Sequence, residues 1–195
     1  FAVDVETGES TAVELPFEGE ITLMSTDAKR PGLSFRLNSY RGESDHFHFD
    51  PLTREVTRTG LMEHFEAIPG IDVTLDTARG ADGQPVAYVV VERAHSLGSA
   101  AIVTAYGAYG FPPYPRMPSR SELHALVDKR DVKLVYAYIR GGSSGLSSAP
   151  SRFWRDPEWS PGDRKWRAAG DLSGVIRKLG KRFIHPDRIT IRAGS

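Results

Sequence analysis

The sequence contains no cysteine among its 195 residues. This absence excludes disulfide bonds, cysteine-ligated zinc sites and a cysteine nucleophile. Because a chain without cysteine fits a reducing compartment, we expect a cytoplasmic location, with a periplasmic protein whose signal has been removed as the alternative. The first five residues have neither a basic start nor a long apolar stretch, so no signal peptide is expected there.

An excess of charge and a long apolar run are missing as well. Lys and Arg number 25, and so do Asp and Glu, which leaves a formal net charge of zero. A neutral chain has no overall attraction for nucleic acids or anionic membranes, so neither is expected as a partner. No apolar run approaches the roughly 18–20 residues that cross a bilayer. With 39% hydrophobic residues, the composition is typical of a globular protein with a substantial core.

Both ends of the sequence suggest a piece of a longer chain. The sequence begins with Phe1 rather than methionine, and it stops at Ser195, directly after a β-rich run and within a turn. We therefore expect these residues to be a fragment.

The first 65 or so residues carry short apolar runs separated by Gly, Pro, Asp and Ser, a pattern that predicts β-strands. The runs are Ala2–Val5, Ile21–Met24, Leu33–Leu37 and His46–Phe49. In two similar turns, a strand leads into an Asp, Asp4 or Asp50, and a Glu opens the next strand; the two Asp residues lie 46 positions apart. A period of roughly 40–50 residues with four short strands predicts a β-propeller blade, although unrelated antiparallel hairpins could give the same pattern.

From about residue 70, strands alternate with helices. The expected elements are a hairpin of 71–75 and 86–91, strands at 100–106, 132–139 and 188–191, and helices at about 119–129 and 166–183. Ser119 and Glu122 have the spacing of a capping box at the start of the first helix. In the second helix, the apolar residues that recur at helical spacing are Trp166, Ala169, Leu172, Ile176, Leu179 and Phe183. The alternation predicts an α/β sheet that begins near Pro69.

The last residues have the pattern of a nucleophile elbow, a sharp turn after a strand that holds a serine hydroxyl above the sheet. Ala193-Gly194-Ser195 follows the strand at 188–191 and supplies the small residues that such a turn requires. Three of the five positions of the G-x-S-x-G pattern are present, and the first is alanine instead of glycine. Because this tripeptide is common in ordinary loops, it does not by itself assign a catalytic serine.

Three segments, taken together, resemble prolyl oligopeptidases and oligopeptidase B across nearly the whole chain. Ile139-Arg140-Gly141-Gly142 resembles the (I/V)-R-G-G-G run of these enzymes, and Tyr106-Gly107-Ala108-Tyr109-Gly110 resembles their Tyr-Gly-rich segment. His185-Pro186-Asp187-Arg188-Ile189, followed by Ala193-Gly194-Ser195, is similar to the approach to the family's serine. The order of the three motifs behind a propeller-like segment is more specific than any one of them.

The resemblance implies an α/β-hydrolase domain joined to a seven-bladed β-propeller. Residues 1–68 would be the C-terminal part of the propeller, its last blade, and residues 69–195 the N-terminal part of a truncated peptidase domain. The family cleaves short peptides, typically after Pro or basic residues, through an acyl-enzyme, and its propeller restricts access. The resemblance makes Ser195 the nucleophile and Tyr106 the donor that stabilises the oxyanion, and it implies no cofactor or metal.

The sequence departs from the family pattern in three places. Gly141-Gly142-Ser143-Ser144 replaces the usual Gly-Gly-Gly-Glu, Ala193 stands where Gly is typical, and Thr104-Ala105 replaces the usual Tyr-Gly. These changes leave the expected fold intact and leave the substrate preference open.

A polypeptide that ends at Ser195 is expected to be inactive. A serine hydroxyl is a weak nucleophile until a histidine, oriented by a carboxylate, takes its proton. In α/β-hydrolases both partners follow the serine in chain order, and so does the residue whose N–H completes the oxyanion hole. A serine-reactive fluorophosphonate probe should therefore leave this polypeptide unlabelled.

Several other residues invite a functional interpretation. His46, His48 and Asp50 alternate and would share one face of a strand, where an exposed polar face is favoured over a metal site. Arg140 is expected to form a structural pair beneath the glycine turn rather than to contact substrate.

The tryptophans Trp154, Trp159 and Trp166 are expected to pack against other residues rather than to line a substrate pocket. Two alternatives to the oligopeptidase function stay open. One is a propeller and hydrolase relic that acts as a non-catalytic interaction module, and the other is a related acylaminoacyl peptidase or esterase.

Overall fold

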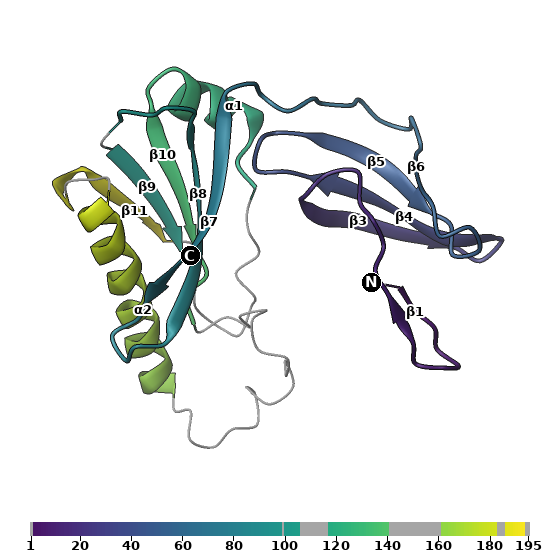
Figure 1. The fold of residues 1–195 in the computed structure, drawn as a ribbon, viewed down its shortest axis with the longest axis horizontal. Helices are drawn as coiled ribbons and strands as arrows, with labels where there is room; N and C mark the ends of the chain where they lie inside the picture. The colour runs from purple at the N-terminus through teal and green to yellow at the C-terminus, as the bar shows by residue number, and fades with distance from the viewer. Residues whose placement is uncertain (1, 99, 106–116, 141–160, 183–185, 194–195) are drawn as a thin grey trace. The chain divides into compact units, whose positions relative to one another are not determined.

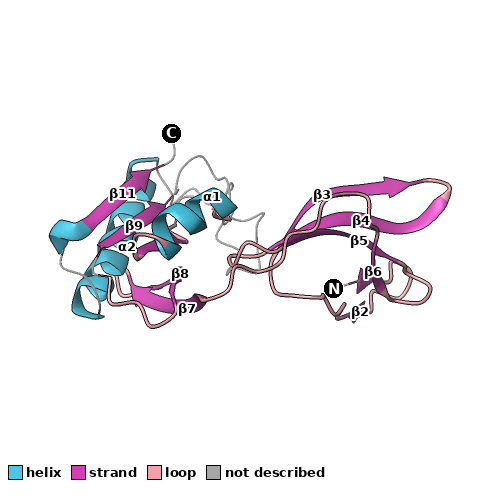
Figure 2. Ribbon diagram, turned by 90° about the horizontal axis from the view of Figure 1, so that it is seen from above, coloured by secondary structure: helices cyan, strands magenta, loops and turns pink. Residues whose placement is uncertain are grey.

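The computed structural model describes residues 2–98, 100–105, 117–140, 161–182 and 186–193 (Figure 1). The chain divides into two compact units, Phe1–Pro69 and Gly70–Ser195. The described residues form mostly β-sheet and few helices (Figure 2). Among them there is no helix with the length and apolar character needed to span a membrane.

The first unit contains a four-stranded antiparallel sheet with the strand order β3-β4-β5-β6. These strands are β3 (Glu20–Asp27), β4 (Arg30–Asn38), β5 (Ser44–Phe49) and β6 (Val56–Arg58), and a separate pair consists of β1 (Ala2–Val3) and β2 (Ser10–Thr11). Alternate residues of β4 and β5 point to the same face, so Phe35, Leu37 and Phe47 gather into a small core. The rings of Phe35 and Phe47 lie 6.0 Å apart, centroid to centroid.

The two similar turns predicted around Asp4 and Asp50 have the same geometry. In each, a carboxylate oxygen of the Asp accepts a hydrogen bond from the amide two residues further on, at 2.9 Å for Asp4 and 2.8 Å for Asp50. The fourth residue after each Asp, Gly8 or Arg54, has a positive φ and donates its N–H to the Asp carbonyl at 2.8 Å. The β1–β2 turn therefore repeats in the β5–β6 turn, which confirms the expected repeat at this position.

The second unit is built on a mixed five-stranded sheet with the order β11-β9-β10-β8-β7. The strands are β7 (Ile71–Arg79), β8 (Pro85–Arg93), β9 (Ala100–Ala105), β10 (Val132–Ala137) and β11 (Ile189–Ala193). The expected hairpin is confirmed as the antiparallel pair β7–β8, and β10 joins β8 antiparallel. The strands β9, β10 and β11 run parallel to one another. Parallel strands are usually covered on both faces, and consecutive residues of β10, Leu134, Val135 and Tyr136, are accordingly buried.

Two helical regions accompany this sheet. The first consists of α1 (Arg120–Glu122) and a π-helical segment (η1, Leu123–Asp128), and the second is α2 (Pro161–Arg182), followed by a 3-10 turn (η2, Pro186–Arg188). α2 packs against β7 and β8 with Ala168, Val175 and Leu179 buried in the main core. At Gly174 a Cβ atom would lie 2.1 Å from the carbonyl oxygen of Arg79, so only glycine allows this close approach of helix and strand.

The expected packing of Trp166 is wrong. Its side chain is 80% exposed, and Ala169, the next member of the predicted apolar stripe, is exposed too. The buried face of α2 is rotated toward Asp171, which is fully buried and hydrogen-bonded to Arg140. The predicted stripe is confirmed at Leu179, which is buried in the core, and at Leu172, which packs against it. It is wrong at Trp166 and Ala169, because a hydrophobicity pattern counts Asp171 as polar although Asp171 lies on the buried face.

Candidate active site

The three parallel strands end at one edge of the sheet, and two of them lead toward the predicted site residues. In the strand register, Ala193 of β11 and Ala137 of β10 both pair with Ala105 of β9. Tyr106 follows Ala105 directly, and Ser195 is the second residue after Ala193. In open sheets with parallel strands, ligands bind outside the carboxyl ends of the strands.

Ser195 and Tyr106 themselves lie outside the described residues. The same is true of Gly141-Gly142, Trp154 and Trp159. The roles assigned to Ser195 and Tyr106 therefore stay predictions.

Arg192 connects the end of β11 to two other segments at this edge. Its Nη1 lies 2.8 Å from Oε1 of Glu122 in α1, and its Nε donates to the hydroxyl of Thr104 in β9 at 3.1 Å. Thr104 is also the backbone partner of Arg192 in the parallel ladder. The side chain thus adds a link to the helix and a second link to β9.

Glu122 is held by the cap of α1 as well as by Arg192. Ser119 and Glu122 form the predicted capping box, in which the Ser119 hydroxyl accepts from the Glu122 amide at 3.1 Å and the Glu122 carboxylate accepts from the Ser119 amide at 3.0 Å. Burial works to raise the pKa of Glu122, but hydrogen bonds from Arg192 and Ser119 outweigh it and lower this pKa. The carboxylate therefore stays charged and oriented toward Arg192.

Arg140, three residues after β10 ends, is clamped between two carboxylates. Its Nε and its backbone amide donate to Oδ2 of Asp171 at 2.8 Å, and its Nη2 donates to Oδ1 at 2.5 Å. Its Nη1 and Nη2 also donate to the two carboxylate oxygens of Asp82 at 2.6 and 2.8 Å. These bonds, chiefly those to Asp171, raise the pKa of Arg140.

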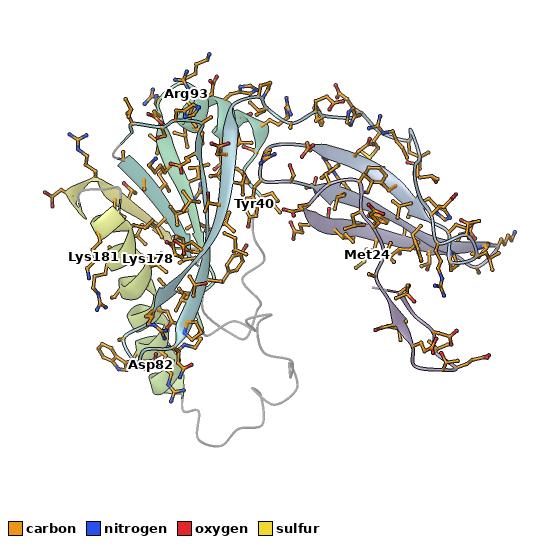
Figure 3. The ribbon with its side chains drawn as sticks, viewed as in Figure 1. Met24, Tyr40, Asp82, Arg93, Lys178 and Lys181 are labelled. Atoms are coloured by element: carbon orange, nitrogen blue, oxygen red, sulfur yellow. The ribbon has the colours of Figure 1, made fainter. Side chains whose placement is uncertain are left out.

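The expectation that Arg140 has a structural partner is confirmed, and the structure identifies two. Asp171 comes from α2, and Asp82 comes from the turn between β7 and β8, where Figure 3 labels it. Arg140 thereby fastens three segments of the second unit together. Since Asp82 and Asp171 are 58 and 31 residues away in sequence, no local pattern identified them.

A third link joins α2 to the sheet at Lys178, which is also labelled in Figure 3. Its Nζ donates to Oδ1 of Asp76 at 2.6 Å, and the Tyr88 hydroxyl donates to the other oxygen of Asp76 at 2.8 Å. The hydrogen bond from Lys178 is the main reason that the pKa of Asp76 is lowered. This pair ties the C-terminal part of α2 to β7, which lies at the opposite edge of the sheet from β11.

The Asp82–Arg140 pair makes stability depend on pH in the acid range. Hydrogen bonds from Arg140 are the main reason that the pKa of Asp82 is lowered from 3.8 to about 2. A carboxyl group whose pKa is lowered by folding stabilises the folded state above its unfolded pKa and loses that contribution as pH falls through the folded one. Asp82→Asn should therefore reduce the fall in melting temperature between about pH 4 and about pH 2 relative to the wild type. Thermal melts of both proteins across this range measure the difference, and identical acid limbs would contradict the assignment.

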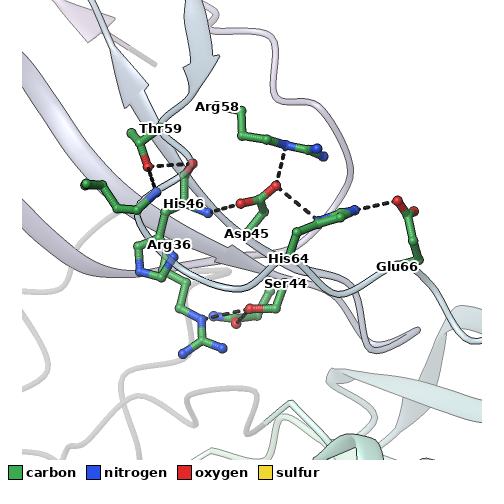
Figure 4. Close-up of polar contacts among 10 residues, drawn as sticks. Arg36, Ser44, Asp45, His46, Arg58, Thr59, His64 and Glu66 are labelled. Atoms are coloured by element: carbon green, nitrogen blue, oxygen red, sulfur yellow. Dashed lines mark hydrogen bonds and ion pairs between the residues drawn. The ribbon is translucent and has the colours of Figure 1, made fainter.

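In the first unit, a cluster of charged residues surrounds the buried carboxylate of Asp45 (Figure 4). Nε of Arg58 lies 2.5 Å from Oδ2 of Asp45, and Nδ1 of His64 lies 3.1 Å from the same oxygen. The other ring nitrogen of His64 lies 2.5 Å from Glu66, so the ring bridges two carboxylates. The cluster fastens the segment after β6 to β5, where Ser44 and Phe65 also exchange backbone hydrogen bonds at 2.9 and 3.0 Å.

The three residues considered for a metal site do not form an exposed polar face. His46, His48 and Asp50 are half-buried, and Nδ1 of His48 is hydrogen-bonded to the Ser34 hydroxyl at 3.2 Å. The difference arises because β5 lies between β4 and β6, so that neighbours such as Ser34 and Thr57 flank His48 on both sides. In the described part of the chain, no group of three or more His, Asp or Glu residues has a metal-binding arrangement.

Comparison with protein-family models found no match, and neither did comparison with curated protein sequences. Comparison with solved structures found many similar chains. A structure from a study of two prolyl endopeptidases matches 98% of the chain with a TM-score of 0.75 and 18% identity. Oligopeptidase B from Leishmania major matches 98% with a TM-score of 0.71 and 17% identity. A post-proline cleaving enzyme from Rickettsia typhi matches all of it with a TM-score of 0.75 and 19% identity.

The resemblance to prolyl oligopeptidases and oligopeptidase B that the motifs predicted is thus confirmed at the level of the fold. The chain spans only about 27–28% of the length of these three structures. Sequence identity below 20% supports a common fold and leaves the activity of this chain to be inferred from its own residues.

Proposed function

We propose that the protein is a serine peptidase of the prolyl oligopeptidase type, which cleaves short peptides through an acyl-enzyme formed at Ser195. The observation that supports this most directly is the strand register. The strand that leads to Ser195 runs parallel to the strand that leads to Tyr106, and Ala193 pairs with Ala105 at their shared edge. A nucleophile elbow requires a strand in this position directly before its serine.

In this proposal the two units have separate tasks. The unit Phe1–Pro69 is the last blade of a propeller that limits access to the site, and Gly70–Ser195 is the first part of an α/β-hydrolase domain. The repeated turn at Asp4 and Asp50 supports the blade, because it recurs at the spacing of a propeller repeat. The parallel strands β9, β10 and β11 support the hydrolase domain.

The chemistry assigns one role to each predicted site residue. The hydroxyl of Ser195 attacks the peptide carbonyl carbon after a histidine has taken its proton, and the amine leaves with a proton from that histidine. The hydroxyl of Tyr106 donates a hydrogen bond to the carbonyl oxygen as negative charge develops on it. In α/β-hydrolases the histidine and its carboxylate partner follow the serine in chain order, so both would come from chain beyond residue 195.

Arg140 takes no part in substrate recognition in this proposal. Its guanidinium already donates to both Asp82 and Asp171, so it has little capacity left for a substrate carboxylate. The preference for Pro, for a basic residue or for an acetylated amino acid therefore depends on other residues.

The test uses the full-length protein, with the natural chain on both sides of these residues. We expect a fluorophosphonate probe to label Ser195, identified by mass spectrometry of the labelled peptide. Hydrolysis of matched substrates with Pro, Arg or an acetylated amino acid before the scissile bond then separates an oligopeptidase from an acylaminoacyl peptidase or esterase. A folded full-length protein that neither reacts with the probe nor hydrolyses any substrate would instead be a non-catalytic relic.

A further inference from the structure

The strand that leads to the proposed nucleophile is held by side chains as well as by its backbone. β11 has five residues, and among the described strands only β9 pairs with it. A hydrogen bond from a side chain to a neighbouring element fixes the end of a strand beyond what the backbone ladder does. Arg192 is the next-to-last residue of β11 and supplies two such side-chain contacts.

The two residues that contact Arg192 come before and after Tyr106 in the sequence. Thr104 lies two residues before Tyr106 at the end of β9, whereas Glu122 lies in α1, after that segment. Arg192 itself lies three residues before Ser195. One guanidinium therefore bridges the strand of the proposed nucleophile, the strand of the proposed oxyanion donor and the helix that follows.

The environment of this pair makes it stronger than an ordinary surface ion pair. The side chains of Arg192 and Glu122 are 37% and 23% exposed, so water screens them only in part. Glu122 is also oriented by the capping box with Ser119, which reduces the entropy lost when it pairs with Arg192. A planar guanidinium that donates to two partners fixes the orientation of its own side chain as well as its distance from them, which an ammonium group does not.

We propose that Arg192 is a positioning residue, which through Glu122 and Thr104 fixes the end of β11 so that Ser195 and Tyr106 act on the same carbonyl group. This inference rests on the proposed peptidase function, because it assigns a role relative to Ser195. It adds residues that the sequence motifs did not identify, since neither Glu122 nor Thr104 belongs to the serine motif.

The test compares variants of the full-length protein in kcat, KM and the rate of labelling by a fluorophosphonate. Arg192→Met keeps an unbranched apolar stem and removes the charge and both hydrogen bonds. It should lower kcat and the labelling rate by about 10- to 100-fold and change KM less than about twofold, because misplacement of a reacting group by about 1 Å can cost 100-fold. Arg192→Lys keeps the charge without the planar fork and should recover only part of the loss.

Two milder variants test the same link if Arg192→Met does not fold. Glu122→Gln removes the negative charge that pairs with Arg192 but keeps a neutral acceptor, and Thr104→Val removes the hydroxyl that accepts from it. Each should lower kcat by about 3- to 10-fold, in keeping with a weakened or lost hydrogen bond of about 1 kcal/mol. In the double variant Arg192→Met with Glu122→Gln, the two effects should not multiply, because both remove the same interaction.

Lys178→Met is the matched control. It removes an ion pair of the same unit, that with Asp76 on β7, the strand at the opposite edge of the sheet from β11. It should lower the melting temperature and leave kcat unchanged. The positioning role would be overturned if kcat were unchanged in the Arg192 and Glu122 variants, or if Lys178→Met lost as much kcat as they do. The peptidase function would still stand in that case, provided that the probe labels the wild type. A wild type that is neither labelled nor active would overturn the proposed function and this inference with it.

Discussion

Replacing Ser195 by alanine in the full-length protein is expected to lower kcat for peptide hydrolysis by about a millionfold. In the proposed mechanism, the substitution removes the atom that forms the acyl-enzyme, whereas the oxyanion donors and the substrate-binding groups stay in place. Substrate binding should therefore change little. Steady-state hydrolysis gives kcat, and binding of an uncleaved substrate to the variant gives its affinity.

Thr190→Ala provides the control for this substitution. Thr190 lies on the same strand, β11, and its side chain is exposed. Its replacement should change kcat less than about threefold, since surface substitutions usually alter free energies by less than about 0.5 kcal/mol. If Ser195→Ala retains most of the activity and loses the fluorophosphonate label, another residue carries the chemistry.

Features with partners close in sequence could be predicted from the sequence. Ser119 and Glu122 form the expected capping box because three residues separate them in the first turn of any helix. The turns at Asp4 and Asp50 also form as expected, because an Asp side chain reaches the amide two residues further on. In both cases the local backbone alone brings donor and acceptor together.

Pairs that depend on the tertiary structure could not be predicted in this way. Asp171 and Arg140 are separated by 31 residues, and nothing in the sequence distinguishes this Asp from an exposed one. The error at Trp166 has the same origin, because the buried side of α2 is determined by Asp171 as well as by apolar residues. His64 bridges Asp45 and Glu66, and no local sequence pattern pairs it with Asp45, which precedes it by 19 positions.

The candidate site lies between these two cases. The strand before Ser195 was expected from its short β-rich run and from the family resemblance, and β11 is present. Its parallel register with β9 and the contact of Arg192 with Thr104 join positions 88 residues apart, so they required the three-dimensional arrangement. Sequence motifs thus predict the reacting groups, whereas the structure identifies the contacts that hold the strands leading to them.

The second large effect is expected for Asp171→Ala, which should lower the free energy of unfolding of the second unit by about 3–5 kcal/mol. The carboxylate of Asp171 is fully buried and accepts three hydrogen bonds, two from the Arg140 guanidinium and one from its backbone amide. Its removal leaves the Arg140 guanidinium with one of its two carboxylates and the Arg140 amide without an acceptor. Each loss lowers the free energy of unfolding by more than the loss of an exposed ion pair does. Urea unfolding of the full-length protein, with hydrogen exchange to locate the change in α2 and β8, measures the loss.

Asp82→Asn is the matched control, because it alters the other partner of the same guanidinium. Its side chain is 43% exposed, so water can replace the lost charge, and the cost should stay below about 1 kcal/mol. Asp171→Asn should fall between the two, since the amide keeps the shape but can accept fewer hydrogen bonds. Equal losses for Asp171→Ala and Asp82→Asn would mean that burial of Asp171 contributes nothing, and that Arg140 is held by charge alone.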